Sequence, residues 1–242
     1  MKAWQIFTHS LRQVFGNFGV AVRVSLIPFL ALVAVTLVFG AAIFGAIMMG
    51  NSSTSPAGII LAAIVYFVIY IAVFCAIAVN WHRFVLLNEP VNWVPTIRLD
   101  RMMAYFGTSL LISVGFGIVA GLIFGVLSVL GGLGIVLAVL IVFFLFSQFW
   151  RLSAALPGAA LGQGGGISSI FAATRGETVT LLVLTLIYLG ASLVVGILVG
   201  ILSMIPVLGM LINLAFQWLA MMVGLSVLTT IYGHYVEKRA LT

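Results

Sequence analysis

Six apolar runs dominate the sequence, and each is close to the length that an α-helix needs to cross a bilayer, about 20 residues. Hydrophobic residues make up 64% of the 242 residues and charged residues only 6%, whereas a soluble domain has roughly 45–50% apolar and about 25% charged residues. This composition excludes a soluble enzyme, a disordered chain and a disulfide-stapled secreted domain. It predicts an all-α, polytopic membrane helix bundle, one integral membrane domain over residues 1–242, with spans at 24–49, 58–80, 104–130, 134–150, 180–204 and 209–232.

The connections between these spans alternate between two kinds, which predicts three hairpins. Those at 50–58, 131–134 and 205–209 are short and uncharged, whereas those at 81–103 and 151–179 are longer and charged. The positive-inside rule makes the charged side cytoplasmic and places both termini on it. With six spans, this side receives all ten basic residues: Lys2, Arg12, Arg23, Arg83, Arg98, Arg101, Arg151, Arg175, Lys238 and Arg239.

The net charge of +6 comes from basic residues that are too few and too scattered for a nucleic-acid groove. We interpret them as orientation signals and as contacts for anionic lipid headgroups on the cytoplasmic side. The second and fourth spans end alike, in Trp81-His82-Arg83 and Trp150-Arg151, and tryptophan favours the membrane–water interface. The residues expected at the headgroups are Arg12, Arg23, Trp81, Arg83, Trp150, Arg151 and Arg175.

The segment that precedes the first span has apolar residues at helical spacing on one face. This stripe consists of Trp4, Phe7, Leu11, Val14, Phe15 and Phe18. We interpret residues 2–18 as an interfacial helix along the cytoplasmic leaflet; the alternative is a simple extension of the first span. Gly16 and Gly19 interrupt the pattern just before Arg23 and favour a separate helix. Short interfacial elements are also expected at 91–103 and 167–174.

Two stretches of the chain resemble each other at a shift of 75 residues. Gly121 and Gly125 correspond to Gly196 and Gly200, and both stretches end one span and turn into the next at Leu133-Gly134 and Leu208-Gly209. The hairpins share one orientation, so they are not the inverted repeats of many transporters. We interpret Gly121, Gly125, Gly196 and Gly200 as helix-packing positions, because small residues four apart let helices approach closely. The pattern leaves open whether they pack within the chain or against a partner.

No span carries Asp, Glu, Lys or Arg in its middle. Because an intramembrane charge is costly and marks ion or proton pathways, the sequence argues against a proton-coupled pump, a voltage sensor and a charged-ion channel. Gln148, Asn213 and Gln217 are candidates for a polar lining, and the last two share a helix face. The alternative is that these amides form interhelical hydrogen bonds.

Candidates for catalysis or metal binding are few. His82, Glu89 and Asp100 share one connection, but no cysteine joins them and their spacing fits no structural zinc site. We expect His82, His9 and His234 to lie at the membrane surface. The glycine-rich segment 162–166 lacks the Lys-Ser/Thr of a phosphate loop. The sequence therefore predicts no catalytic residue, metal or cofactor. Asn51-Ser52-Ser53 matches a glycosylation sequon, which we attribute to chance.

Three stretches of the chain carry a pattern found in a family of bacterial six-span proteins: Trp81-HRFVLLNEP, Arg151-LSAALPGAALGQ and Ile170-FAATRGETVTLLVLTLI. An Arg-initiated apolar run ends in Leu156-Pro157, and a short helix that ends at 172–176 leads directly into the next span. The pattern resembles the YciC-like proteins and the related membrane domain fused to glycerophosphodiester phosphodiesterases. This resemblance implies an integral protein of the bacterial inner membrane, and it implies no catalytic residues and no phosphodiesterase activity.

Two functions compete on this sequence. The first is a non-catalytic membrane module that binds lipids, another membrane protein or a second copy of itself. The second is a transporter or permeation protein for a small neutral or amphipathic solute. An intramembrane enzyme is disfavoured, because no acid–base pair or metal cluster is visible.

Overall fold

The structure is a computed structural model that describes residues 2–48, 55–163, 166–205 and 207–241. These residues form nine α-helices and no strand: α1 (Lys2–Gly16), α2 (Phe18–Met48), α3 (Pro56–Leu87), α4 (Leu99–Ser128), α5 (Gly131–Ser153), α6 (Leu156–Leu161), α7 (Gly166–Ala173), α8 (Thr178–Leu202) and α9 (Leu208–Tyr235). The predicted all-α class is confirmed. The sequon at Asn51 lies outside the described residues.

Within this described part, six helices are long and apolar enough to cross a membrane, as in a multi-pass membrane protein. They are α2, α3, α4, α5 with its continuation α6, α8 and α9. Several extend further toward the charged connections than the apolar runs predict: α3 continues to Leu87 and α5 to Ser153. They continue because the polar side chains near their ends, including Asn80 and Arg151, form hydrogen bonds inside the protein.

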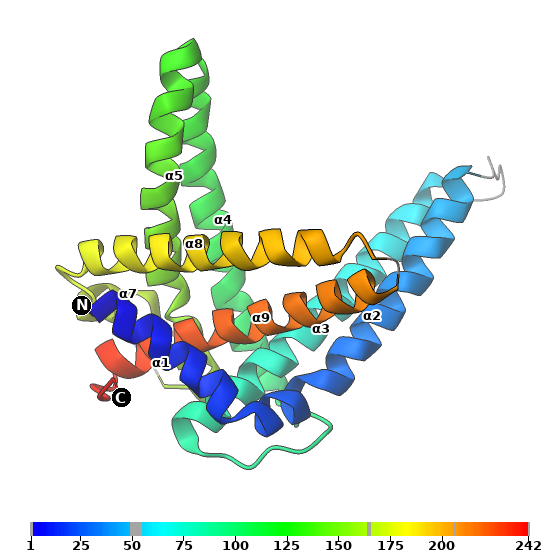
Figure 1. Cartoon of the computed structure of the whole chain (residues 1–242), viewed down its shortest axis with the longest axis horizontal. Helices are drawn as coiled ribbons and strands as arrows, with labels where there is room; N and C mark the ends of the chain where they lie inside the picture. The colour runs from blue at the N-terminus through cyan, green and yellow to red at the C-terminus, as the bar shows by residue number, and fades with distance from the viewer. Residues whose placement is uncertain (1, 49–54, 164–165, 206, 242) are drawn as a thin grey trace.

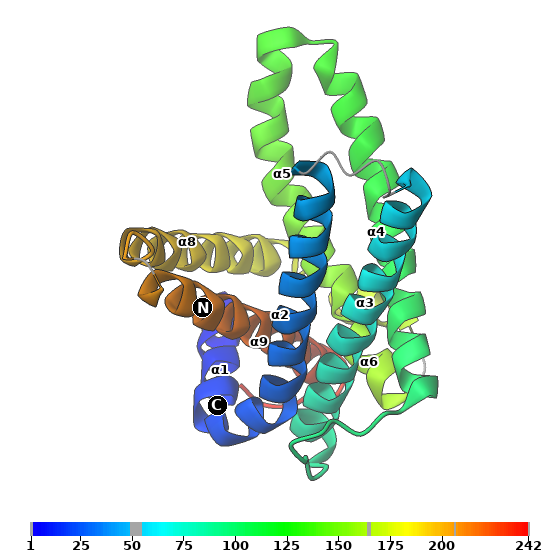
Figure 2. The ribbon, with the colours of Figure 1, turned by 90° about the vertical axis from the view of Figure 1, so that its right-hand side faces the viewer.

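The six long helices form three hairpins, α2–α3, α4–α5 and α8–α9, which diverge from a common base (Figures 1 and 2). We call these hairpins the arms. At the base, the inner ends of the long helices pack against α1, α6 and α7. We call this packed region the basal core; its largest fully buried side chains are Ile6, Val14, Val24, Ile77, Trp81, His82, Tyr105, Ile170, Leu181, Leu184, Met222 and Ile231.

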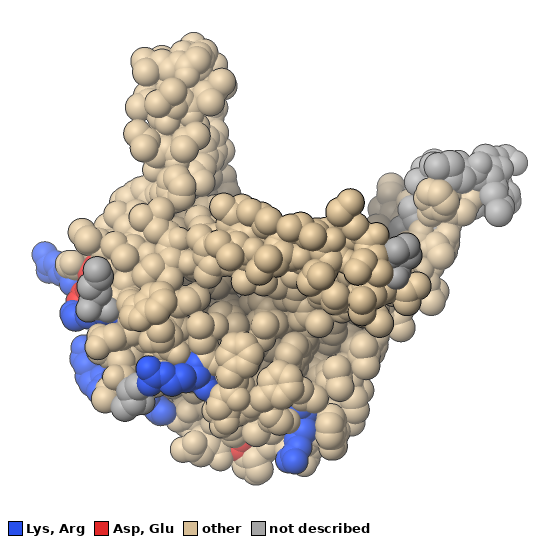
Figure 3. Space-filling view, viewed as in Figure 1, with Lys and Arg blue, Asp and Glu red and all other residues tan. Residues whose placement is uncertain are grey.

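The arms expose apolar side chains along most of their length, and α9, whose inner half runs through the basal core, is the most buried of the six. The face seen in Figure 3 has its Lys, Arg, Asp and Glu side chains around the base, and the upper arm is free of them. An apolar surface of this extent is unfavourable in water and matches lipid.

The N-terminal helix α1 is amphipathic, as expected, but its buried face differs from the predicted stripe. Ala3, Ile6, Phe7, Ser10 and Val14 are buried, because α1 packs on α9 and α8. The hydroxyl oxygens of Ser10 and of Thr230 in α9 lie 3.0 Å apart, within hydrogen-bond distance, and Lys2 pairs with Glu177 beside α8 at 2.5 Å. Trp4 and Phe15 of the predicted stripe remain exposed.

The 75-residue repeat corresponds to a structural equivalence at two hairpin turns. Gly134 lies in the first turn of α5 and Gly209 in the first turn of α9, each just after its hairpin turn. A Cβ at Gly134 would clash with the backbone carbonyl of Leu127, and a Cβ at Gly209 would lie 2.5 Å from Cα of Ser203. Both neighbours are backbone atoms at the end of the preceding helix, so only glycine fits these tight turns.

The four glycines predicted as packing positions have open space on their Cβ side in the described structure. A Cβ added to Gly121, Gly125, Gly196 or Gly200 would meet no described atom within 4 Å. Packing of these faces on another protein or on a second copy of the chain stays a prediction.

We expect Gly134→Ala and Gly209→Ala each to lower the free energy of unfolding by about 1–3 kcal/mol, because the added methyl overlaps backbone that has little room to move. Gly121→Ala and Gly200→Ala serve as matched controls in the same arms. Since alanine favours helix over glycine by about 1 kcal/mol, we expect these two variants to be neutral or slightly stabilised. Unfolding in mixed micelles, followed by circular dichroism, measures the differences. Equal losses at all four positions would argue against this account of the turns.

Candidate functional site

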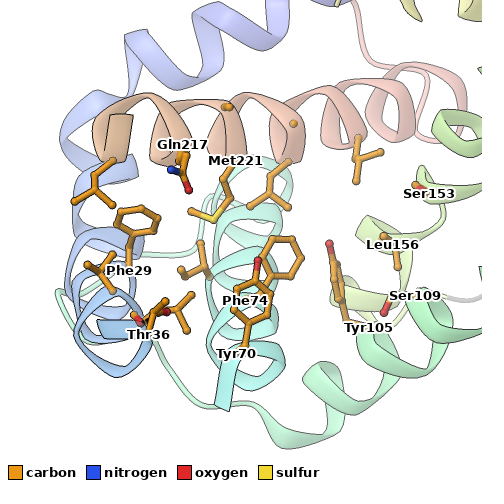
Figure 4. Close-up of a pocket in the computed structure, with 18 of the residues that line it drawn as sticks. Phe29, Thr36, Tyr70, Phe74, Tyr105, Ser109, Ser153, Leu156, Gln217 and Met221 are labelled. Carbon is orange, nitrogen blue, oxygen red and sulfur yellow. Dashed lines mark hydrogen bonds between the residues drawn. The ribbon is translucent and has the colours of Figure 1, made fainter. Parts of the chain in front are cut away.

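A cavity of about 780 Å³ lies between the arms, bounded by α2, α3, α4, α5, α6 and α9. This volume falls within the range of small-molecule sites, about 300–1,000 Å³. Figure 4 shows side chains from several helices converging on it. We call it the inter-arm cavity; its lining includes Phe29, Thr36, Tyr70, Phe74, Tyr105, Ser109, Ser153, Leu156, Gln217 and Met221.

The walls of the inter-arm cavity are apolar and uncharged. Phe29 comes from α2, Phe74 from α3 and Met221 from α9, and none of the described lining residues is Asp, Glu, Lys or Arg. At the rim, Leu37 and Met210 are 60% and 56% exposed. The cavity therefore opens onto the apolar surface of the arms, the surface that we expect lipid to cover.

The floor of the cavity carries three hydroxyl groups. Tyr105 and Ser109 share a face of α4, since they are four residues apart, and Ser153 ends α5. Ser109 Oγ donates to the carbonyl of Phe106 at 2.8 Å. Ser153 is 3% exposed and has no hydrogen-bond partner among the described residues. The floor thus offers three hydroxyl groups in a cavity with mainly apolar walls; the other polar side chains in the lining are Thr36, Tyr66, Tyr70 and Gln217.

A buried imidazole lies behind Tyr105. His82 is fully buried, and its ring stacks on that of Tyr105 at 5.7 Å between centroids. Its Nδ1 lies 2.7 Å from Thr229 Oγ1, and its Nε2 lies 3.5 Å from the Tyr105 hydroxyl. The expectation of a surface position for His82 is wrong, because α3 continues past the apolar run and carries this residue into the basal core.

Two predicted headgroup residues are also buried in protein. Trp81 is fully buried and its Nε1 donates to Ser226 Oγ of α9 at 3.0 Å. Arg151 is 7% exposed, and its guanidinium bonds Thr174 and the carbonyl of Phe171. A headgroup position is therefore wrong for both, because the basal core supplies the polar partners that we had assigned to lipid headgroups.

The other predicted headgroup residues have different surroundings. Arg12, Arg23 and Arg175 are exposed at the base. Arg83 is partly buried and pairs with Glu89. Trp150 is half-buried, stacks edge-on against Tyr188 and lines the inter-arm cavity.

The first charged connection is held by a compact polar cluster. Arg83 contacts both carboxylate oxygens of Glu89, Arg98 pairs with Glu89 at 2.9 Å, and Asn80 bonds the backbone of Thr96. The hydrogen bonds from Arg83 hold the pKa of Glu89 below its usual 4.5. Arg83 also donates to the carbonyl of Ala160 at 3.1 Å. The cluster fixes the connection and α6 to α3, and α6 forms part of the cavity boundary.

The three amides predicted as a polar lining are placed differently. Gln217 lines the inter-arm cavity, and Figure 4 shows its side chain extending from α9 into it. Asn213 accepts a hydrogen bond from Gln217 at 2.5 Å, as their shared helix face predicts. Gln148 does not line the cavity and donates to Ser147 at 3.2 Å.

The three hydroxyl groups on the floor of the cavity are not among the site residues predicted from the sequence. Tyr105 and Ser109 had a readable signal, since they form an i,i+4 polar pair at the start of the third span. Ser153 had none, because its role depends on how α5 and α6 meet α4. Among the described residues, no group of three or more His, Cys, Asp and Glu side chains could hold a metal ion.

Comparison with models of protein families, with curated proteins and with solved structures finds no match to this chain.

Proposed function

We propose that this chain is a non-catalytic membrane module that binds a lipid in the inter-arm cavity. One observation carries the proposal: a cavity of about 780 Å³ with uncharged, mainly apolar walls opens between arms whose surfaces are themselves apolar. A molecule can enter such a cavity from the bilayer without first passing through water. Burial of its apolar surface would then drive binding, at about 25 cal/mol per Å².

The proposed location is the bacterial inner membrane, with both termini cytoplasmic. Support for this orientation comes from the basic residues, which all precede, connect or follow spans on one side. Arg12 and Arg23 are exposed, and so are Trp4 and Phe15 of α1, a combination suited to anionic headgroups and the interface. The proposed resemblance to the YciC-like proteins agrees with this location.

A transporter for a small neutral or amphipathic solute is the second candidate. It is favoured by one observation, the position of Gln217 in the cavity lining. A route to the charged side would have to pass the basal core, where Trp81, Tyr105 and Ile231 are almost completely buried. We therefore favour binding without passage.

Photo-crosslinking in proteoliposomes tests the binding proposal. A phospholipid with a diazirine in its acyl chain is expected to label peptides that contain Phe29, Phe74 and Met221 more strongly than peptides from the arm tips. Ala220 lines the cavity, so Ala220→Trp should obstruct it and reduce this labelling about fivefold or more, since a bulky side chain forced into occupied space costs about 1–3 kcal/mol.

Ala63→Trp is the matched control, because Ala63 is exposed on α3 and lies outside the cavity lining. Labelling of the cavity peptides should be unchanged in this variant. Labelling spread evenly over the arms, and insensitive to Ala220→Trp, would refute the proposal.

A further inference from the structure

The hydrogen bonds behind the floor of the inter-arm cavity determine which floor groups can donate to a ligand and which can accept from it. Thr229 Oγ1 donates to the carbonyl of Leu225 at 2.8 Å, so its hydrogen is already committed. His82 Nδ1, 2.7 Å from the same oxygen, must therefore carry a hydrogen and donate it to Thr229. Because Nδ1 carries a hydrogen, the role of Nε2 as donor or acceptor depends on whether the ring is charged or neutral.

The imidazole is neutral in this setting, because its described partners are hydroxyl groups and an uncompensated buried cation is costly. In a neutral imidazole with its hydrogen on Nδ1, Nε2 can only accept. The Tyr105 hydroxyl lies 3.5 Å from Nε2 and supplies the donor. Tyr105 Oη then keeps its lone pairs for a group in the cavity.

The neighbouring hydroxyls complete this arrangement. Ser109 has also given its hydrogen to backbone, so its oxygen is an acceptor as well. Ser153 lines the cavity and forms no described hydrogen bond to protein, and its hydroxyl oxygen is visible at the edge of the cavity in Figure 4. This hydroxyl can donate to a ligand oxygen.

The described lining carries no Asp, Glu, Lys or Arg side chain, and this argues against a charged lipid headgroup in the cavity. A phosphate or carboxylate would lose its hydration here and find no cation to compensate. A hydroxyl group meets all three conditions, since it is neutral, donates to Tyr105 or Ser109, and accepts from Ser153.

We infer that the inter-arm cavity selects a neutral lipid with a free hydroxyl headgroup, such as a long-chain alcohol or a mono- or diacylglycerol. The hydroxyl occupies the floor at Tyr105, Ser109 and Ser153, and the hydrocarbon chain extends along Phe74 and Met221 toward the rim. This inference rests on the proposed lipid binding and adds the chemistry of the headgroup.

Three photoactivatable probes with the same diazirine-bearing chain test it: a primary alcohol, its methyl ester and the carboxylic acid. The alcohol can donate and accept, the ester can only accept, and the ionised acid carries a charge. In proteoliposomes at neutral pH, the alcohol is expected to label the cavity peptides of α3 and α9 about fivefold more than the ester does, the effect of one neutral hydrogen bond. The acid should label them least.

Tyr105→Phe removes an acceptor oxygen that only the alcohol can use, so it should bring alcohol labelling down toward that of the ester and leave ester labelling unchanged, with circular dichroism as a check on folding. Ser153→Ala removes a donor that both probes can use, so it should lower labelling by the alcohol and the ester alike. Ser147→Ala, a buried serine on α5 outside the cavity lining, is the control and should preserve the preference for the alcohol.

Equal labelling by alcohol and ester, or strongest labelling by the acid, would overturn the headgroup assignment while leaving lipid binding intact. Failure of all three probes to label cavity peptides above the arm tips would instead overturn the proposed function.

Discussion

Trp81→Ala is expected to lower the free energy of unfolding by about 3–5 kcal/mol, the usual cost of truncating a buried Trp or Phe. Trp81 is fully buried in the basal core, where it packs on Phe84 and donates from Nε1 to Ser226. Truncation would leave a cavity in the region where α3 meets α9 and would remove the donor to Ser226. Because the basal core also positions the cavity floor, we expect binding at the inter-arm cavity to weaken as well.

Trp93→Ala provides the matched control for Trp81. Trp93 lies in the first charged connection and is 51% exposed, so its loss should change stability by less than about 0.5 kcal/mol. Unfolding in mixed micelles, followed by circular dichroism, compares the two variants. Similar small effects at both positions would mean that Trp81 is an interfacial anchor, as the sequence alone suggests.

Arg151→Met is expected to cost about 3 kcal/mol, because it removes a charged donor from several buried acceptors. The Arg151 guanidinium lies 4.0 Å from the centre of the Phe171 ring and donates to Thr174 Oγ1 at 2.6 Å. It also donates to the carbonyls of Phe171 and Thr174 at 3.1 and 3.0 Å. The Phe171 carbonyl lies in the last turn of α7, where carbonyls lack an intrahelical donor, and the Thr174 carbonyl, just after α7, accepts in addition from the Glu177 N–H at 3.1 Å. Their loss of a partner should detach α7 from α5.

Arg151→Lys should be almost as harmful, since an ammonium group cannot reproduce the planar fork of the guanidinium. Arg175→Met is the control, because Arg175 follows Thr174 directly in the chain and its side chain is exposed. Limited proteolysis near residues 163–166 gives a local readout: cleavage should rise in both Arg151 variants and stay unchanged in Arg175→Met. Normal resistance in Arg151→Met would contradict the proposed role of this side chain.

The membrane-spanning organisation could be predicted from the sequence because it depends on local properties. Run length and hydrophobicity fix where helices cross a bilayer, and the glycine repeat correctly marked two equivalent turns at Gly134 and Gly209. The divergence of the arms could not be predicted in this way. It depends on how the inner helix ends pack with α1, α6 and α7, and those contacts join segments far apart in the chain.

The same limitation explains the errors at Trp81, His82 and Arg151. Their residue types are typical of a membrane interface. A single sequence does not reveal that, at the ends of these spans, packed protein surrounds the side chains instead of lipid headgroups. Gln217 was identified as a lining residue because a polar amide in an apolar span is conspicuous. Tyr105 and Ser153 were overlooked because hydroxyl groups near span ends are common and become informative only when a cavity connects them.

Native mass spectrometry of the protein, extracted with its surrounding membrane into nanodiscs, tests the central claim most directly. We predict that the wild-type chain retains a lipid after release from the bulk bilayer, and that this lipid is neutral and carries a hydroxyl group. Ala220→Trp should lose it, whereas Ala63→Trp should keep it. Release of the wild-type chain without bound lipid, or equal retention by wild type and Ala220→Trp, would contradict lipid binding in the inter-arm cavity.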